Sequence, residues 1–116
     1  MTDLIACLST GKGTWAEVLK VINAEEWNKV YLLTNEFGKE KFNHEKAELI
    51  VINEKEIKPM SNEIYEKLKG KVKFNDVAVN IVSGSGKEHM ALLPALLKLG
   101  VGIRFVTVEN EKIMEI

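Results

Sequence analysis

The residues best suited to chemistry in this 116-residue chain lie in one short turn, Ser83 to Lys87. Gly84 and Gly86 permit backbone angles closed to other residues, so successive amide N–H groups can converge on one point. Ser83 and Ser85 add hydroxyl groups. Lys87 stands where a following helix begins, a position at which the helix dipole disfavours a cation. We therefore predict that the turn and Lys87 bind an anion such as a phosphate.

Two common phosphate-binding motifs do not fit this turn. In the NTPase motif G-x-x-x-x-G-K-[ST], the first glycine falls on Ile81 and the final hydroxyl residue on Glu88. The hydroxyl that binds Mg²⁺ is therefore missing, and we do not expect ATP hydrolysis of that type. The dinucleotide fingerprint G-x-G-x-x-G also fails, because His89 stands where its third glycine belongs. The alternative is a tight strand-to-helix connection with no ligand.

Polar residues also follow two earlier predicted strands, Asp3 to Ser9 and Lys29 to Thr34. In parallel sheets, ligands bind at the carboxyl ends of strands near the point where the strand order reverses. If the first and fourth strands are neighbours, the first turn and the turn at Ser83 meet there. We therefore add these residues to the predicted ligand contacts: Ser9, Thr10, Gly11, Lys12, Gly13, Thr34 and Asn35.

The hydrophobic pattern alternates between strands and helices along the chain. It predicts an α/β fold: a Rossmann-like, doubly wound, mainly parallel sheet of about five strands, with a C-terminal antiparallel hairpin strand and helices on both faces. The whole chain, residues 1–116, is expected to form one domain. The remaining predicted elements are a helix capped by Thr14, a short helix or loop from Phe37 to His44, a strand from Glu48 to Asn53, a helix from Ile57 to Leu68 with Ser61 as N-cap, a strand from Asp76 to Val82, a helix from Lys87 to Leu99, and strands from Val101 to Val108 and Lys112 to Ile116.

The helix that follows the glycine turn is apolar on almost every side from Met90 to Leu99. One side can cover the sheet, and the other must also be shielded from water. A second copy of the chain is the expected cover, so we predict a homodimer through this helix. Pro94 removes one helical hydrogen bond and should bend the helix.

Composition limits the other partners and the compartment. The formal net charge is −1, with 46% hydrophobic and 28% charged residues. A near-neutral chain is not expected to bind DNA or a membrane through its general surface. The single cysteine, Cys7, excludes an internal disulfide, and no signal peptide or membrane-spanning run is visible. We expect a cytoplasmic protein.

Several other reactive side chains have structural interpretations. Cys7 lies inside an apolar strand, where a thiol packs as a small hydrophobic group. Trp15 shares the apolar stripe of its helix, which favours packing over stacking on a base. His89 lies close to Lys87 and is a candidate general acid or base; the alternative is a contact with a dimer partner. No ligand spacing for a metal is present, and no cofactor is expected.

Taken together, the fourth-strand residues resemble the CARF (CRISPR-associated Rossmann fold) family. The matching positions are Asn80, Ser83, Gly84, Ser85, Gly86, Lys87 and the apolar run MALLPALLKLG, together with the small polar turn Ser9-Thr10-Gly11. The resemblance implies a homodimer whose two-fold axis passes through a pocket for a cyclic oligoadenylate, the second messenger of type III CRISPR immunity. Proteins of that family usually carry an effector domain, and we expect none in these 116 residues, which should form a single domain. Three roles remain: cleaving the messenger, sequestering it, or signalling to a separate chain.

Stand-alone proteins of this kind include ring nucleases, which cleave the messenger without metal. A ribose 2′-hydroxyl attacks the adjacent phosphodiester, and the protein holds the geometry and neutralises charge. The resemblance then implies that Lys87 stabilises the phosphorane, that Ser9 or Thr10 orients the reacting groups, and that His89 assists. Two alternatives stay open: a non-catalytic sensor or sponge for cyclic oligoadenylate, and a different nucleotide- or sugar-phosphate-binding α/β protein.

Overall fold

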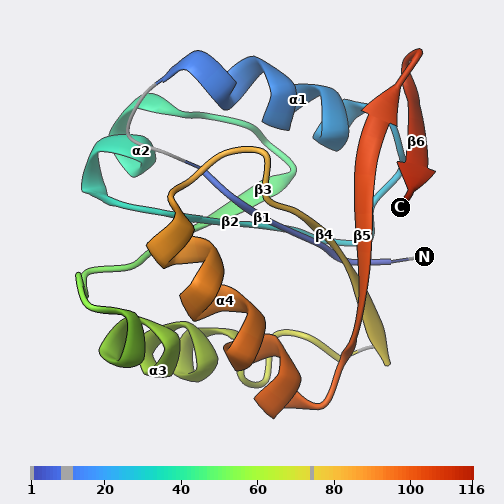
Figure 1. Cartoon of the computed structure of the whole chain (residues 1–116). Helices are drawn as coiled ribbons and strands as arrows, with labels where there is room; N and C mark the ends of the chain where they lie inside the picture. The colour runs from blue at the N-terminus through green and yellow to red at the C-terminus, as the bar shows by residue number, and fades with distance from the viewer. Residues whose placement is uncertain (1, 9–11, 74) are drawn as a thin grey trace.

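The computed structural model describes residues 2–8, 12–73 and 75–116, without the side chain of Lys12. A six-stranded mixed sheet runs through it in the order β3-β2-β1-β4-β5-β6 (Figure 1). Strands β1 to β5 are parallel, and β6 pairs antiparallel with β5. The strands are β1 (Leu4–Cys7), β2 (Val30–Thr34), β3 (Ala47–Val51), β4 (Asp76–Asn80), β5 (Gly102–Glu109) and β6 (Lys112–Glu115). The helices are η1 (Lys12–Thr14), α1 (Trp15–Asn23), α2 (Glu36–Lys41), α3 (Ile57–Leu68) and α4 (Gly86–Leu99).

The first strand lies between the second and the fourth. Ala6 of β1 is in register with Leu32 of β2 on one side and with Asn80 of β4 on the other. The first and fourth strands are therefore neighbours, which is the condition on which the predicted meeting of the two turns depends. The predicted α/β fold with a mainly parallel sheet is confirmed. The connections that leave β1 and β4 therefore start side by side at one edge of the sheet.

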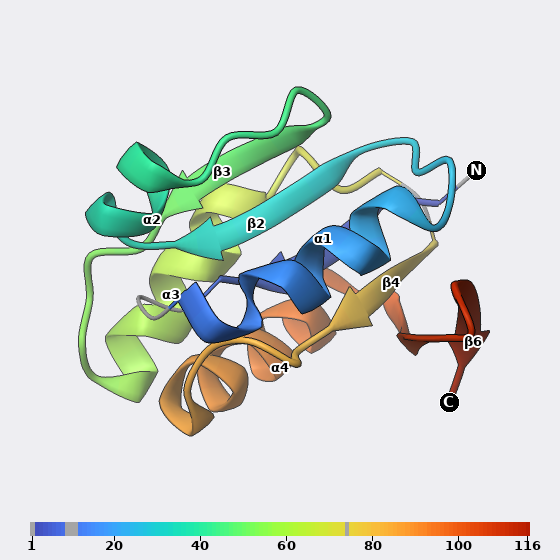
Figure 2. The ribbon, with the colours of Figure 1, turned by 90° about the horizontal axis from the view of Figure 1, so that it is seen from above.

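Helices cover both faces of the sheet. Figures 1 and 2 show α1 across one face, with α3 and α4 packed together across the other. Side chains of β1 alternate between the two faces: Leu4 and Ala6 belong to the apolar cluster under α1, whereas Ile5 and Cys7 belong to the cluster under α3 and α4. Burial on both faces explains why β1 and β2 read as continuous apolar runs.

Helix α4 buries one side and exposes the other. Ala91, Leu92, Ala95 and Leu96 are buried against the sheet and α3. In contrast, Met90 is 61% exposed and Leu97 is 68% exposed. The expected apolar outer side is therefore present, and its cover by a second copy stays a prediction. Within the described residues, no helix is long and apolar enough to span a bilayer.

Of the two predicted helix caps, Ser61 is wrong, whereas Thr14 is the N-cap residue of α1 by position. Ser61 lies inside α3 and is buried, because the helix already begins at Ile57 after the N-cap Glu56. Pro59 is compatible with this start, since the first helical turn needs no hydrogen bond from its amides. Thr14 precedes α1 but makes no side-chain cap bond. The predicted helix at Lys87 begins one residue earlier, with Ser85 as its N-cap.

Candidate functional site

The turns after β1 and β4 are joined by a hydrogen bond. Thr14 Oγ1 donates to Ser83 Oγ at 2.6 Å, and Ser83 is buried. This contact brings η1 against the β4–α4 turn, as the neighbouring strands require. The predicted contacts Ser9, Thr10 and Gly11, and the side chain of Lys12, lie outside the described residues.

The β4–α4 turn is built around Asn80 and Gly84. The Asn80 side chain donates to Val106 O at 2.9 Å and accepts from Val82 N at 3.2 Å, so it holds the turn to β5. Gly84 has a φ of +99°, which favours glycine. A Cβ at this position would lie 2.9 Å from Cys7 Cβ. The glycine therefore lets the turn pack directly against the end of β1.

A capping box closes the start of α4. Ser85 Oγ accepts from Glu88 N at 3.2 Å, and Glu88 Oε1 accepts from Ser85 N at 2.6 Å. The sequence prediction treated the turn amides as open to a ligand, but a carboxylate of the chain already accepts from one of them. In the described part of the chain, the amides of Gly86 and Lys87 remain as donors at this helix start.

Lys87 extends from the first turn of α4 toward the loop before α3. Its Nζ lies 3.4 Å from Glu56 Oε1, and both side chains are largely exposed. Glu56 is the N-cap residue of α3, although its side chain does not cap that helix. Lys87 is therefore already paired with a carboxylate, through a contact open to water.

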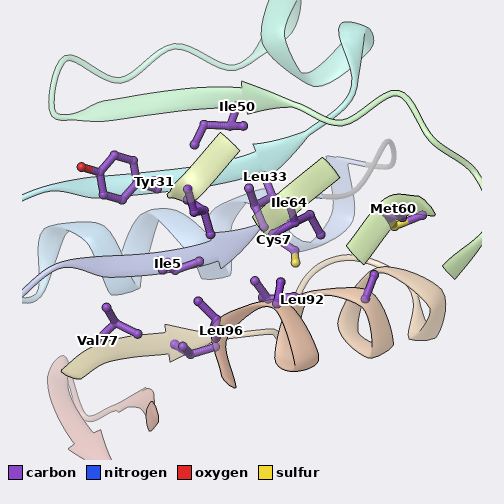
Figure 3. Close-up of a cluster of buried hydrophobic side chains, with 14 residues drawn as sticks. Ile5, Cys7, Tyr31, Leu33, Ile50, Met60, Ile64, Val77, Leu92 and Leu96 are labelled. Atoms are coloured by element: carbon purple, nitrogen blue, oxygen red, sulfur yellow. The ribbon is translucent and has the colours of Figure 1, made fainter. Parts of the chain in front are cut away.

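A pocket of about 370 Å³ lies between this turn, the carboxyl ends of β1 and β2, and α3. Its floor is apolar, and Figure 3 shows Cys7 and Leu33 of the sheet facing Met60 and Ile64 of α3. Its polar rim contains two lysines and two glutamates, so the formal charges of the lining cancel. The complete lining is Cys7, Leu33, Thr34, Asn35, Ile52, Glu54, Lys55, Met60, Ile64, Gly84, Ser85, Lys87 and Glu88.

Five predicted contact residues line this pocket: Thr34, Asn35, Gly84, Ser85 and Lys87. Two of them already have structural partners, since the Thr34 hydroxyl donates to Leu8 O at 3.2 Å and Asn35 Oδ1 accepts from Gly38 N at 2.9 Å. Their side chains therefore shape the edge of the pocket. Four further predicted residues do not belong to the lining: Gly13, Ser83, Gly86 and His89.

The imidazole of His89 points back into the β4–α4 turn. Its Nε2 lies 2.8 Å from Ser83 O, and a carbonyl oxygen can only accept, so Nε2 carries a proton. This hydrogen bond holds the turn that Ser83 and Gly84 form. The geometry thus gives His89 a supporting contact beside the pocket, whereas the sequence made it a candidate general acid or base, with a dimer contact as the alternative.

Cys7 lies on the pocket floor as a neutral thiol. Burial, reinforced by the negative charge of Glu88, raises the pKa of Cys7 to about 12. A thiol with that pKa supplies almost no thiolate at neutral pH, so it does not serve as a nucleophile. This agrees with the packing role expected from its place in an apolar strand.

Sequence reasoning missed one wall of the pocket. Ile52, Glu54 and Lys55 come from the loop that follows β3, and Met60 and Ile64 come from the helix after it. A usable signal was present, because β3 is a parallel neighbour of β2 and its carboxyl end must reach the same edge. Glu88 was missed because its place after Lys87 was considered only for the absent Mg²⁺-binding hydroxyl.

Comparisons with known proteins assign neither a family nor a function to this site. No family model matches the sequence, and no curated protein matches it.

Among the described residues, no group of three or more His, Cys, Asp or Glu side chains is placed to hold a metal ion.

Proposed function

We propose that this chain is a Rossmann-like, doubly wound member of the CARF family that binds a cyclic oligoadenylate, cyclic tetra-adenylate in particular. The observation that carries the proposal is the pocket beside the start of α4, with an apolar floor and Lys87 on its rim. It lies at the edge where β1 and β4 are neighbours and the strand order reverses. Open α/β sheets bind their ligands at this place.

The two sides of the pocket suit the two chemical parts of a nucleotide. Met60 and Ile64 offer an apolar surface for a flat base, whereas the backbone amide and the ammonium of Lys87 offer donors for a phosphate. A pocket for phosphate alone needs no apolar floor. An adenylate unit uses both sides at once, which favours a nucleotide over a simple anion.

A homodimer through Met90–Leu99 completes the proposal. Met90 and Leu97 are large, exposed apolar residues on the outer side of α4. A two-fold axis beside this helix would bring two equivalent Lys87 residues and two pockets toward one symmetric ring of phosphates. Each protomer would then hold part of the ring.

We further propose metal-independent cleavage of the ring. A ribose 2′-hydroxyl attacks the adjacent phosphorus, the bond to the 5′-oxygen breaks, and a 2′,3′-cyclic phosphate and a 5′-hydroxyl are formed. The nucleophile belongs to the ligand, so the protein must align it in line and neutralise the phosphorane. Lys87 would supply the positive charge, and Ser9 or Thr10, which lie outside the described residues, would orient the reacting groups.

A second candidate, a non-catalytic sensor or sponge, is favoured by the position of His89. Its Nε2 donates to Ser83 O and the residue does not belong to the pocket lining, so no described imidazole serves the leaving group there. Such a protein would bind cyclic tetra-adenylate and release no product.

A third candidate, a mononucleotide- or sugar-phosphate-binding protein, is favoured by the lining itself. The charges of Glu54, Lys55, Lys87 and Glu88 cancel, which suits a small ligand better than a polyanionic ring. The pocket of about 370 Å³ is also at the small end of the usual range for ligand sites.

One experiment separates these candidates. Purified protein is incubated with cyclic tetra-adenylate, binding is measured by calorimetry, and products are resolved by chromatography. We expect binding and linear products, with Lys87→Ala reducing both at least tenfold and Lys41→Ala, at an exposed lysine of α2 outside the pocket lining, leaving both unchanged. Binding without product identifies a sensor or sponge. Equal competition by AMP identifies a mononucleotide site, and no binding contradicts the family proposal.

A further inference from the structure

We propose that Lys87 and Glu56 form a latch that closes one wall of the pocket, and that an anionic ligand opens it by taking Lys87. The ligand-driven step rests on the proposed function, because it needs a phosphate at the start of α4. The latch itself concerns only the residues of the chain.

The wall in question is the loop between β3 and α3, residues 52–56. Ile52, Glu54 and Lys55 of this loop line the pocket. Near its β3 end, the loop is fastened by Glu63, whose Oε1 accepts from Asn53 N at 2.9 Å and from Glu54 N at 2.9 Å. The Glu63 side chain is only 14% exposed, and charge-assisted hydrogen bonds of this kind are strong.

The end of the loop that joins α3 is held more weakly. Glu56 contacts Lys87 at 3.4 Å, with the two side chains 77% and 56% exposed. Exposed ion pairs contribute little to stability, because water and salt screen them. Within the described residues, this contact is the ion pair that joins the loop to α4. One end of the wall is therefore fixed and the other is easily released.

A ligand phosphate competes directly with Glu56. It would occupy the start of α4, where the Gly86 and Lys87 amides, the helix dipole and the Lys87 ammonium all favour negative charge. The Glu56 carboxylate at Lys87 would then be repelled by that phosphate. Glu88 cannot replace Glu56 there, because the capping box holds its carboxylate on Ser85 N at 2.6 Å. Glu54 and Lys55 also face the pocket, and their charges offset each other.

Opening the latch should loosen the first turn of α3. Met60 N donates to Glu56 O at 2.9 Å, so the Met60 amide reports directly on the residue that the latch holds. Occupation of the pocket is thereby transmitted to the amino end of α3. Helix α3 in turn packs along α4, whose outer side is the proposed dimer surface.

Amide hydrogen exchange in the ligand-free protein tests the latch without any ligand. We expect Glu56→Gln and Lys87→Gln each to speed exchange of the Met60 amide about two- to fivefold, as loss of a weak ion pair allows. The double variant should show no further increase, because both substitutions remove the same contact. Glu54→Gln, which neutralises a carboxylate of the same wall, should leave this amide unchanged. Wild-type exchange rates in Glu56→Gln and Lys87→Gln would overturn the latch.

Binding of cyclic tetra-adenylate tests the ligand-driven step. Glu56→Gln should bind it about two- to fivefold more tightly than wild type at low salt, with the difference lost at high salt. The ligand should speed Met60 exchange in wild type and leave it unchanged in Glu56→Gln. Equal affinities, or slower Met60 exchange in liganded wild type, would overturn this step. No binding by any variant contradicts the proposed function, and the exchange rates of the ligand-free proteins then decide the latch alone.

Discussion

Gly84 combines two requirements at one position of the β4–α4 turn. Residues other than glycine rarely adopt its φ of +99°, and an added Cβ would lie 2.9 Å from Cys7 Cβ. We expect Gly84→Ala to lower the free energy of unfolding by about 1–3 kcal/mol, because strain and crowding act together. Urea denaturation measures this loss.

Gly86 provides the matched control for that substitution. It begins α4, its φ is not positive, and an added Cβ meets nothing within 4 Å. Gly86→Ala should therefore stay within about 0.5 kcal/mol of wild type. Equal losses at the two glycines would contradict the role assigned to Gly84.

The Cys7 thiol makes stability depend on alkaline pH. Burial raises the pKa of Cys7 to about 12 in the folded chain. The stabilisation that the neutral thiol gives is therefore fully present below the pKa of the unfolded chain, and it is lost as pH rises toward 12. The stability difference between wild type and Cys7→Ala should shrink above pH ~9, by up to about 1.4 kcal/mol per pH unit. Denaturation at pH 7, 9 and 10.5 measures it. A difference that stays constant would contradict a protonated buried thiol.

At the scale of elements, hydrophobic periodicity located most of the secondary structure, whereas the capping residues were harder to predict. Ser61 reads as an N-cap in the sequence, yet the chain enters α3 four residues earlier. The local sequence does not distinguish a helix that begins at Ile57 from one that begins after Ser61, because Pro59 is compatible both with a position just before a helix and with its first turn. The Ser85–Glu88 capping box was not predicted, although residues 85–88 match its S-x-x-E pattern.

Glu63 fastens the β3–α3 loop to α3, and its titration reports on that contact. Burial alone would raise the pKa of Glu63, but hydrogen bonds from Glu54 N, Lys67 and Asn53 N outweigh it and lower the pKa. A lowered pKa means that the stabilisation is present above the unfolded pKa and is lost as pH falls through the folded pKa. We expect Glu63→Gln to cost about 1–2 kcal/mol at pH 7 and less at pH 3, which is below the ordinary pKa of a glutamate.

Glu66→Gln is the control for that prediction, because Glu66 lies exposed on the same helix. It should leave the free energy of unfolding unchanged at both pH values. A cost for Glu63→Gln that persists undiminished at pH 3 would show that the carboxylate charge does not hold the loop.

Across the whole molecule, the alternation of strands and helices predicted a mainly parallel sheet, but it left the adjacency of β1 and β4 as a condition, which the structure meets. That adjacency sets the β4–α4 turn beside the carboxyl end of β1, at one edge of the sheet. The pocket wall was not predicted, because it depends on how far the β3–α3 loop reaches over that edge. Such reach is set by tertiary contacts, here from Glu63 and Lys87. The sequence of the loop shows no pattern from which these tertiary contacts could be predicted.

The outer side of α4 makes the prediction that concerns the whole assembly. Leu97 is 68% exposed and contributes nothing to the protomer core, so a charge there should spare the fold and disturb only a dimer. We expect wild type to sediment as a dimer and Leu97→Glu to associate at least tenfold more weakly, about 1.4 kcal/mol, with an unchanged circular dichroism spectrum. Lys41→Glu makes a charge reversal at an exposed position of another helix, α2, and should stay dimeric. A monomeric wild type at every concentration, or a Leu97→Glu dimer of full strength, would contradict association through this helix. A ring of phosphates would then have to be held by one pocket alone, because the second Lys87 is available only from a partner copy.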